Sequence, residues 1–229
     1  MPHPIQAFLA TATLERQLAQ IRNGVVCGLS QLLDLKDLNT GVHSTRLAEW
    51  SVRIAEKLGM NEEYQRDVEL AALLHDIGKV GIPDAVLKKP GRLTEDEFRT
   101  IQKHPEFGWS ILRLLPGFER VSLFVLHHHE RADGKGYPGG LQGQQIPLGS
   151  RIISIMDAFD AMVSDRVYRK GLLLEESLRR IREAAGTQFD PEIVLHFTAI
   201  VKWQLPEVSL IAEPQLHAYQ SGNRAPQAV

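Results

Sequence analysis

Apolar residues recur at helical spacing along most of this chain. An early run, in steps of three or four, comprises Leu14, Leu18, Ile21 and Val25. Such steps place side chains on one face of a helix, and no stretch alternates for long enough to build a sheet. The pattern predicts an all-helical fold. Helices are expected over residues 1–35, 43–59, 62–75, 94–104, 107–115, 119–130, 151–163, 175–185 and 190–201.

Local signals predict where several of these helices begin and end. Thr94 and Glu97 form a capping-box pattern at the start of a helix expected to contain Phe98, Ile101 and His104. Pro105 follows at once and is expected to interrupt that helix beside His104. Gly78 is predicted to end the helix that contains His75.

Composition excludes several classes of protein. With 229 residues, of which 43% are hydrophobic and 24% charged, the chain is typical of a soluble globular protein. A formal net charge of -2 gives no sign of a surface for nucleic acid polymers or membranes. No segment reaches the length of a membrane span and no leader pattern is visible, so a cytoplasmic location is expected. Cys27 is the only cysteine, so any metal ligands must be nitrogen and oxygen atoms.

Three segments are expected. Residues 1–35 form an N-terminal helical extension, which could pack on the core or pair with a second subunit. Residues 36–205 contain the main domain. Residues 206–229 are polar and lose helical periodicity, so this tail is expected to be mobile.

Adjacent His75 and Asp76 are the first candidates for chemistry. Neighbouring side chains on a helix diverge by about 100°, so such a pair suits a cluster of two metals better than one small ion. A single His-Asp pair is more often a hydrogen-bonded structural pair, so a metal site is predicted only if further ligands are found elsewhere in the chain. The remaining candidates are His43 near a helix start, His104 beside Pro105, and the run His127–His129.

Carboxylates and cations late in the chain extend the candidate site. The three histidines follow apolar residues, which favours a metal role over a solvated surface run. Asp157 lies in an apolar helix and needs a partner, which a metal would supply, whereas Asp160 needs no more than a hydrogen-bonded neighbour. After them come Arg166, Arg169 and Lys170, which form a candidate phosphate-binding cluster.

With these residues in this order, the sequence resembles the HD-GYP family, HD-superfamily phosphohydrolases that cleave cyclic di-GMP. The matching segments are TGVHSTR at 40–46, HDIGKVGIPD at 75–84, HHERADGKGYPGGL at 128–141, DAFDAMVSDRVYRK at 157–170 and FDP at 189–191. The resemblance implies an HD-superfamily helical bundle with an extra GYP loop and C-terminal helices. Residues 36–205 would be its catalytic domain.

The resemblance also implies two metal sites. One would be held by His43, His75, Asp76 and Asp157, the other by His104, His128 and His129, with Asp76 as the bridge. Asn39 stands where some members carry a glutamate for a third metal, so two ions are expected. Nitrogen and oxygen ligands favour iron or manganese. His127 precedes the usual pair and is assigned to neither metal.

The implied reaction is hydrolysis of cyclic di-GMP to pGpG, GMP or both, in which two metals acidify a shared water and polarise the phosphate. Asp76 and Lys79 would be the catalytic residues. The substrate contacts would be Lys79, Tyr137, Arg166, Arg169 and Lys170. Two alternatives stay open: a phosphodiesterase for another cyclic dinucleotide or nucleotide, and a non-catalytic signalling module that keeps the fold and binds a partner such as a cyclic di-GMP synthase.

Overall fold

The computed structural model describes residues 4–36, 42–164 and 170–203. These residues form helices and no strand longer than an isolated bridge, so the all-helical prediction is confirmed. The elements are α1 Pro4–Lys36, α2 Val42–Lys57, α3 Glu62–Leu74, η1 Ile77–Gly81, α4 Asp84–Leu87, α5 Glu95–Ile101, α6 His104–Leu112, α7 Glu119–Leu126, η2 Gly143–Gln145, α8 Leu148–Val163, α9 Leu174–Glu183 and α10 Pro191–Trp203. Asn39, Arg166, Arg169 and the predicted tail 206–229 lie outside the described residues.

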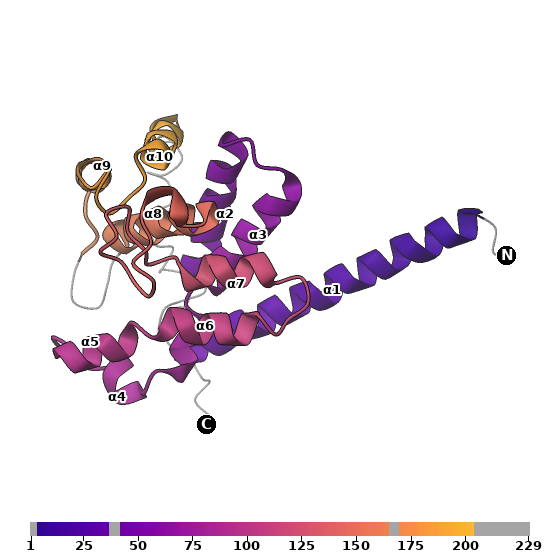
Figure 1. Ribbon diagram of the computed structural model, residues 1–229, viewed down its shortest axis with the longest axis horizontal. Coiled ribbons are helices and arrows are strands. Elements are labelled where there is room, and N and C mark those ends of the chain that lie inside the picture. The colour runs from indigo at the N-terminus through magenta and orange to yellow at the C-terminus, as the bar shows by residue number, and fades with distance from the viewer. Residues whose placement is uncertain (1–3, 37–41, 165–169, 204–229) are drawn as a thin grey trace, which may run out of the picture.

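The core forms where α2, α3, α7 and α8 pack against one another (Figure 1). Each contributes fully buried aliphatic side chains, among them Leu47, Ile54, Leu74, Val125 and Ile152. Removing such side chains from water is the main stabilising contribution to a fold of this size. The packing also fixes the ends of these helices relative to one another.

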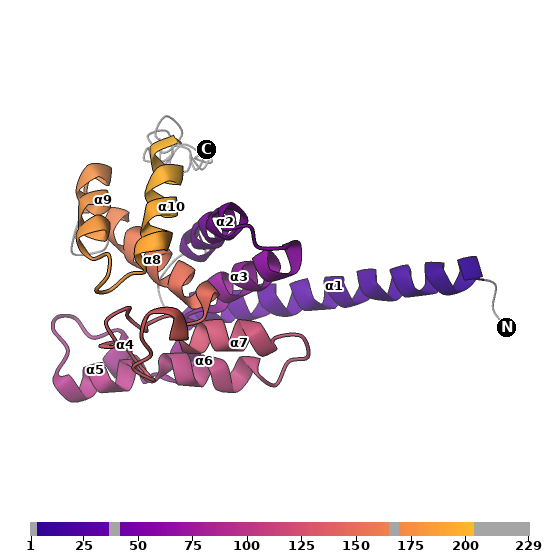
Figure 2. The ribbon, with the colours of Figure 1, turned by 45° about the horizontal axis from the view of Figure 1, so that its top comes forward.

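Helix α1 contacts the domain only through the part nearest its C-terminus. That part packs against η1 and α3, and there Val26 and Leu33 are buried. The N-terminal half extends away from the other helices in both views (Figures 1 and 2).

Around His104 the structure differs from the sequence prediction. The capping box is present, since Thr94 accepts from the Glu97 backbone and Glu97 accepts from Thr94. The helix that it starts ends at Ile101, however, and His104 is the first residue of the separate helix α6. Pro105 therefore does not interrupt a helix; it lies in the first turn of α6, where its missing N–H costs little.

Gly78 has a different role from the predicted helix stop. It lies inside the 3-10 turn η1, where a Cβ would come 1.8 Å from the carbonyl oxygen of His104 and 2.4 Å from the backbone nitrogen of Gly108. The missing side chain therefore lets η1 lie directly against the start of α6. This contact brings His75 and Asp76 next to His104.

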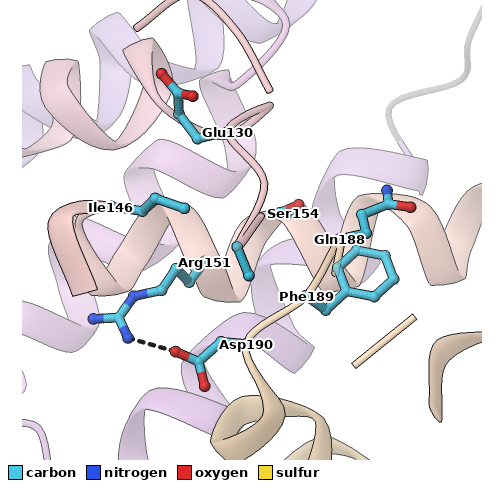
Figure 3. Close-up of a pocket in the computed structure, with 8 residues that line it drawn as sticks. Glu130, Ile146, Arg151, Ser154, Gln188, Phe189 and Asp190 are labelled. Carbon is cyan, nitrogen blue, oxygen red and sulfur yellow. Dashed lines mark hydrogen bonds and ion pairs between the residues drawn. The ribbon is translucent and has the colours of Figure 1, made fainter. Parts of the chain in front are cut away.

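At the C-terminal end, Asp190 precedes α10 as the sequence indicated. Its side chain accepts from the backbone N–H of Glu192 at 2.9 Å, and its other oxygen accepts from Arg151 Nη1 at 2.6 Å. The pair links the start of α8 to the start of α10 beside a small cavity that is also lined by Glu130 and Phe189 (Figure 3).

Replacing Gly78 with alanine tests the close contact between η1 and α6. Because the added Cβ would meet backbone atoms that cannot rotate away, we expect Gly78→Ala to lower the free energy of unfolding by about 1–3 kcal/mol, measured in urea by circular dichroism. Gly24→Ala is the matched control. A Cβ there has no neighbour within 4 Å, so we expect unchanged or higher stability. Equal stability of Gly78→Ala and the wild-type protein would contradict this account.

Candidate metal centre

Three histidines of the site are oriented by the same local hydrogen bond. His75, His104 and His128 each donate Nδ1–H to the carbonyl three residues earlier, at 2.8, 2.8 and 2.6 Å. Because Nδ1 is the donor, the lone pair of each neutral ring is on Nε2, the atom that is left to bind a metal. All three side chains are buried.

His104, His128 and His129 form one group. Their ligand atoms lie within 4.8 Å of one another, and the Nε2 atoms of His104 and His128 are 3.4 Å apart. Three imidazole nitrogens that converge in this way, without a carboxylate among them, could hold one divalent ion. The group combines the start of α6 with the turn after α7.

His43, His75 and Asp157 form a second group. Asp157 Oδ1 lies 3.8 Å from His43 Nε2 and 4.0 Å from His75 Nε2. The Nε2 atom of His75 is buried and makes no hydrogen bond within the described part of the chain. A buried polar atom without a partner is costly, so this atom fits the position of a metal ligand.

Asp76 lies between the two groups. Its Oδ2 is 3.4 Å from His75 Nε2, and its Oδ1 is 3.5 Å from His104 Nε2. Lys79 approaches the same carboxylate, with Nζ 2.8 Å from Oδ2. One carboxylate that faces both groups has the geometry of a bridge between two ions.

Burial and neighbouring charges shift the ionisation of these side chains in opposite directions. Burial alone would raise the pKa of Asp76, but Lys79 and His75 hold that pKa well below its usual value. Burial would lower the pKa of His75, but Asp76 and Asp157 outweigh it and raise the pKa to about 9. In the other group, burial lowers the pKa of His104 and His128, and that of His129 to about 3. The group of His104, His128 and His129 is therefore neutral, whereas the carboxylates beside His75 favour positive charge at that ring, which a metal ion could supply in place of a proton.

Asp160 orients His43 through the ring nitrogen that does not face Asp157. It accepts a hydrogen bond from His43 Nδ1, and its other oxygen accepts from Arg46 Nε at 2.5 Å. Arg46 also donates to Ser164 Oγ at 2.6 Å. A hydrogen-bonded neighbour was expected for Asp160, but Arg46 was missed. Their spacing along the chain gave no signal, because the two belong to α2 and α8, 114 residues apart.

Glu130 is a second residue of the site that was not predicted from the sequence. Its buried carboxylate accepts from the backbone N–H groups of Gly139 at 2.6 Å and Leu141 at 3.0 Å. It therefore holds the glycine-rich loop against the histidine run. His127 turns toward this carboxylate, with Nδ1 3.4 Å from Oε1, and belongs to neither histidine group. An acidic residue directly between a histidine run and a glycine-rich loop was the available signal.

The predicted substrate contacts are only partly described. The Tyr137 ring lies 4.9 Å from the His129 ring, centroid to centroid, and burial raises the pKa of its hydroxyl. Lys79 lies at Asp76, as given above. The side chain of Lys170 is exposed.

Several known proteins are similar to this chain in sequence. The model of the HD domain family matches residues 28–193. A cyclic di-GMP phosphodiesterase of Thermotoga maritima is 42% identical over 176 residues, covering 76% of this chain and 48% of that protein. The response regulator RpfG of Xanthomonas campestris, also named a cyclic di-GMP phosphodiesterase, is 42% identical over 72% of this chain and 44% of its own length. The chain thus spans about half the length of these relatives.

Solved structures share the fold. A cyclic GMP-AMP specific phosphodiesterase of V. cholerae has a TM-score of 0.63 at 21% identity, covering 83% of this chain and 50% of that one. The HD domain of the L. monocytogenes phosphodiesterase PgpH has a TM-score of 0.57 at 20% identity, covering 79% and 98%.

An all-helical domain in which His43, the His75-Asp76 pair and Asp157 come together is typical of the HD class of proteins. The chain belongs to the HD domain family, and its resemblance to the HD-GYP branch is confirmed. Within the described residues, no helix combines the length and apolar character needed to cross a membrane.

Glu130→Gln tests the anchoring of the glycine-rich loop. The amide nitrogen cannot accept a backbone hydrogen bond, so one of the two contacts to Gly139 and Leu141 is lost. We expect amide hydrogen exchange at residues 139 and 141 to become roughly tenfold faster or more, following the loss of about 1–2 kcal/mol of local stability. Lys135→Gln, which changes an exposed side chain on the same loop, is the control. Unchanged exchange in Glu130→Gln would mean that the loop is held by other contacts.

Proposed function

We propose that this chain binds two divalent metal ions, one at each histidine group, and hydrolyses a phosphodiester bond of a cyclic dinucleotide. The observation that carries the proposal is the geometry of Asp76, whose two oxygens face one group each at 3.4 and 3.5 Å. His43, His75, Asp76 and Asp157 would hold one ion and His104, His128 and His129 the other, with Asp76 as the bridge. The names of the relatives support the same class of reaction.

The two ions would supply an acidified water and neutralise charge on the phosphate. The chain's own residues would position the substrate. Lys79, 2.8 Å from Asp76, is within reach of a phosphate oxygen beside that carboxylate and would stabilise its developing charge. Tyr137 would border the substrate next to His129. Arg166, Arg169 and Lys170 would hold the second phosphate and so orient the first for in-line attack.

Ligand chemistry favours iron or manganese as the ions. The ligand set proposed here contains imidazoles and carboxylates and no sulfur, and such sets suit redox-active or oxygen-preferring metals as well as zinc. Structural zinc is disfavoured because one carboxylate faces two groups, whereas structural zinc sites are closed tetrahedra around a single ion.

Cyclic di-GMP is the substrate that we favour. Relatives named cyclic di-GMP phosphodiesterase reach 42% identity, and the V. cholerae 3'3'-cGAMP-specific phosphodiesterase 3 reaches 38% over 73% of this chain. Both substrates present two phosphodiester bonds and differ only in one base. An assay must therefore include both.

Hydrolysis is tested with protein reconstituted anaerobically with ferrous iron or manganese. We expect turnover of cyclic di-GMP to pGpG, GMP or both, followed by chromatography of the products, with 3'3'-cGAMP and cyclic mononucleotides as the comparison panel. Asp76→Asn should reduce the rate by at least about a thousandfold, since it alters the bridge of both sites. His127→Ala, which changes a histidine outside both groups, should retain most of the activity. No turnover of any cyclic dinucleotide would refute the proposal.

Metal content gives a second, independent prediction. We expect two equivalents of iron or manganese per wild-type chain by elemental analysis. His128→Ala should lose about one equivalent, because it removes a ligand from one group only. His127→Ala, one residue earlier, should keep both. Equal loss in the two variants would contradict the assignment of His127.

A non-catalytic module with the same fold is the competing hypothesis. It would bind a partner such as a cyclic di-GMP synthase through the surface of the glycine-rich loop. The seven converging side chains favour the enzyme, since a signalling module does not need them. Metal content below one equivalent that cannot be raised by reconstitution, together with retained synthase binding in His75→Ala, would favour the module. A homodimer through α1 is compatible with either hypothesis.

A further inference from the structure

One face of α1 carries large apolar side chains that the described chain leaves in solvent. Leu14, Leu18, Ile21 and Val25 are between 37% and 63% exposed. They are separated alternately by four and three residues, which is the spacing of the a and d positions of a coiled coil. Leu32, 55% exposed, continues the series at an a position. We call the surface of these five residues the α1 seam.

The α1 seam is not the face that packs on the chain's own domain. Val26 and Leu33, which are buried there, each follow a seam residue directly and so point about 100° away from it. The projecting half of the helix has no neighbouring helix in either view (Figures 1 and 2). The seam thus lacks a partner within the described residues, and contiguous exposed apolar surface of this kind marks an interaction site.

We infer that two copies of this chain pair through the α1 seam as an antiparallel coiled coil, with Leu18 of one copy opposite Ile21 of the other. This pairing does not rest on the proposed hydrolysis.

Packing favours the antiparallel arrangement. In this register Leu14 meets Val25 of the other copy and Leu18 meets Ile21. The two-fold symmetry of the dimer repeats each pair, so four layers of the seam are filled. Gly28, at the next d position, falls opposite Thr11 instead of another glycine. In a parallel, in-register pair Gly28 would meet itself, and a Cβ at Gly28 has no neighbour in its own chain within 4 Å. Such a layer would leave a void inside the seam.

Charge selects the same orientation and the same register. The sequence has a glutamate at 15 and an arginine at 22, both at e positions. Antiparallel helices bring e positions of the two copies together, so Glu15 lies opposite Arg22 twice in each dimer. A shift by one heptad in either direction would put Arg22 opposite Arg22 or Glu15 opposite Glu15.

An apolar groove beside the C-terminal end of α1 is consistent with the antiparallel arrangement. It is lined by Leu29, Leu32, Lys36, Ile77, Val80 and Ile111. The register places residues 5–9 of the other copy opposite residues 30–34. The end of each helix would thus lie over the groove of its partner.

Sedimentation of the full chain over a range of concentrations tests the interface. We expect a wild-type dimer and a dissociation constant raised roughly tenfold or more by Leu18→Glu, because a charge would enter an apolar layer. Gln20→Glu adds the same charge to an exposed position off the seam and should leave the dimer intact. Arg22→Glu should weaken the dimer, and Glu15→Arg combined with Arg22→Glu should restore it. A monomer at every concentration, or a dimer insensitive to Leu18→Glu, would overturn the inference.

Disulfide formation tests the orientation in a Cys27→Ser background. We expect Leu14→Cys combined with Val25→Cys to form a covalent dimer on oxidation, whereas neither single variant does so. A covalent dimer of Leu14→Cys alone would indicate parallel helices and overturn the proposed arrangement. Metal content and hydrolysis are measured separately on Leu18→Glu, so loss of the dimer and loss of the proposed activity can be told apart.

Discussion

The approach of Asp76 to both histidine groups is the interaction on which the rest of the site depends. A buried carboxylate is unfavourable unless positive charge or hydrogen bonds compensate for its lost hydration. Here Lys79 and His75 provide that compensation, and the residues around them are supplied by α3, η1 and α6. The geometry therefore requires that η1 lie directly against α6, which explains why a glycine without free space occupies position 78.

A second constraint is that each ligand ring must present the correct nitrogen. Three histidines meet it locally, since each follows a helical carbonyl by three residues and donates Nδ1–H to it. His43 lies near the first turn of its helix, where no such carbonyl precedes it in a helix, and it uses the carboxylate of Asp160 instead. Residues far apart in the sequence thus act as orienting neighbours, and Arg46 holds Asp160 in turn.

Much of the fold and of the candidate site could be predicted from the sequence, because both depend on local patterns. Helical spacing of apolar residues identified the helices, and the order of histidines and aspartates, with the resemblance that they carry, identified the side chains that converge. The predictions that were wrong concerned contacts between segments that are distant in the sequence. Nothing local shows that Gly78 meets the backbone of His104, or that the Thr94 helix ends at Ile101 so that His104 can start a helix facing Asp76. Glu130 stands between the histidine run and the glycine-rich loop, which was a signal, but its role was not predictable because its partners are backbone N–H groups that no pattern of side chains reveals.

The proposed pairing involves the same turn, η1, that lies against α6 in the site. Val26 and Leu33 pack on the domain beside η1, and Lys36, the last residue of α1, forms an ion pair with Asp84 shortly after η1. The groove that the partner helix would cover is lined by Ile77 and Val80, on either side of Gly78 and Lys79. A partner that fills this groove would contact η1 and α6 together, since Ile111 of α6 also lines it. Pairing would therefore restrict movement of the turn that carries Lys79, because the exposed side chain of Val80 in that turn would then be packed.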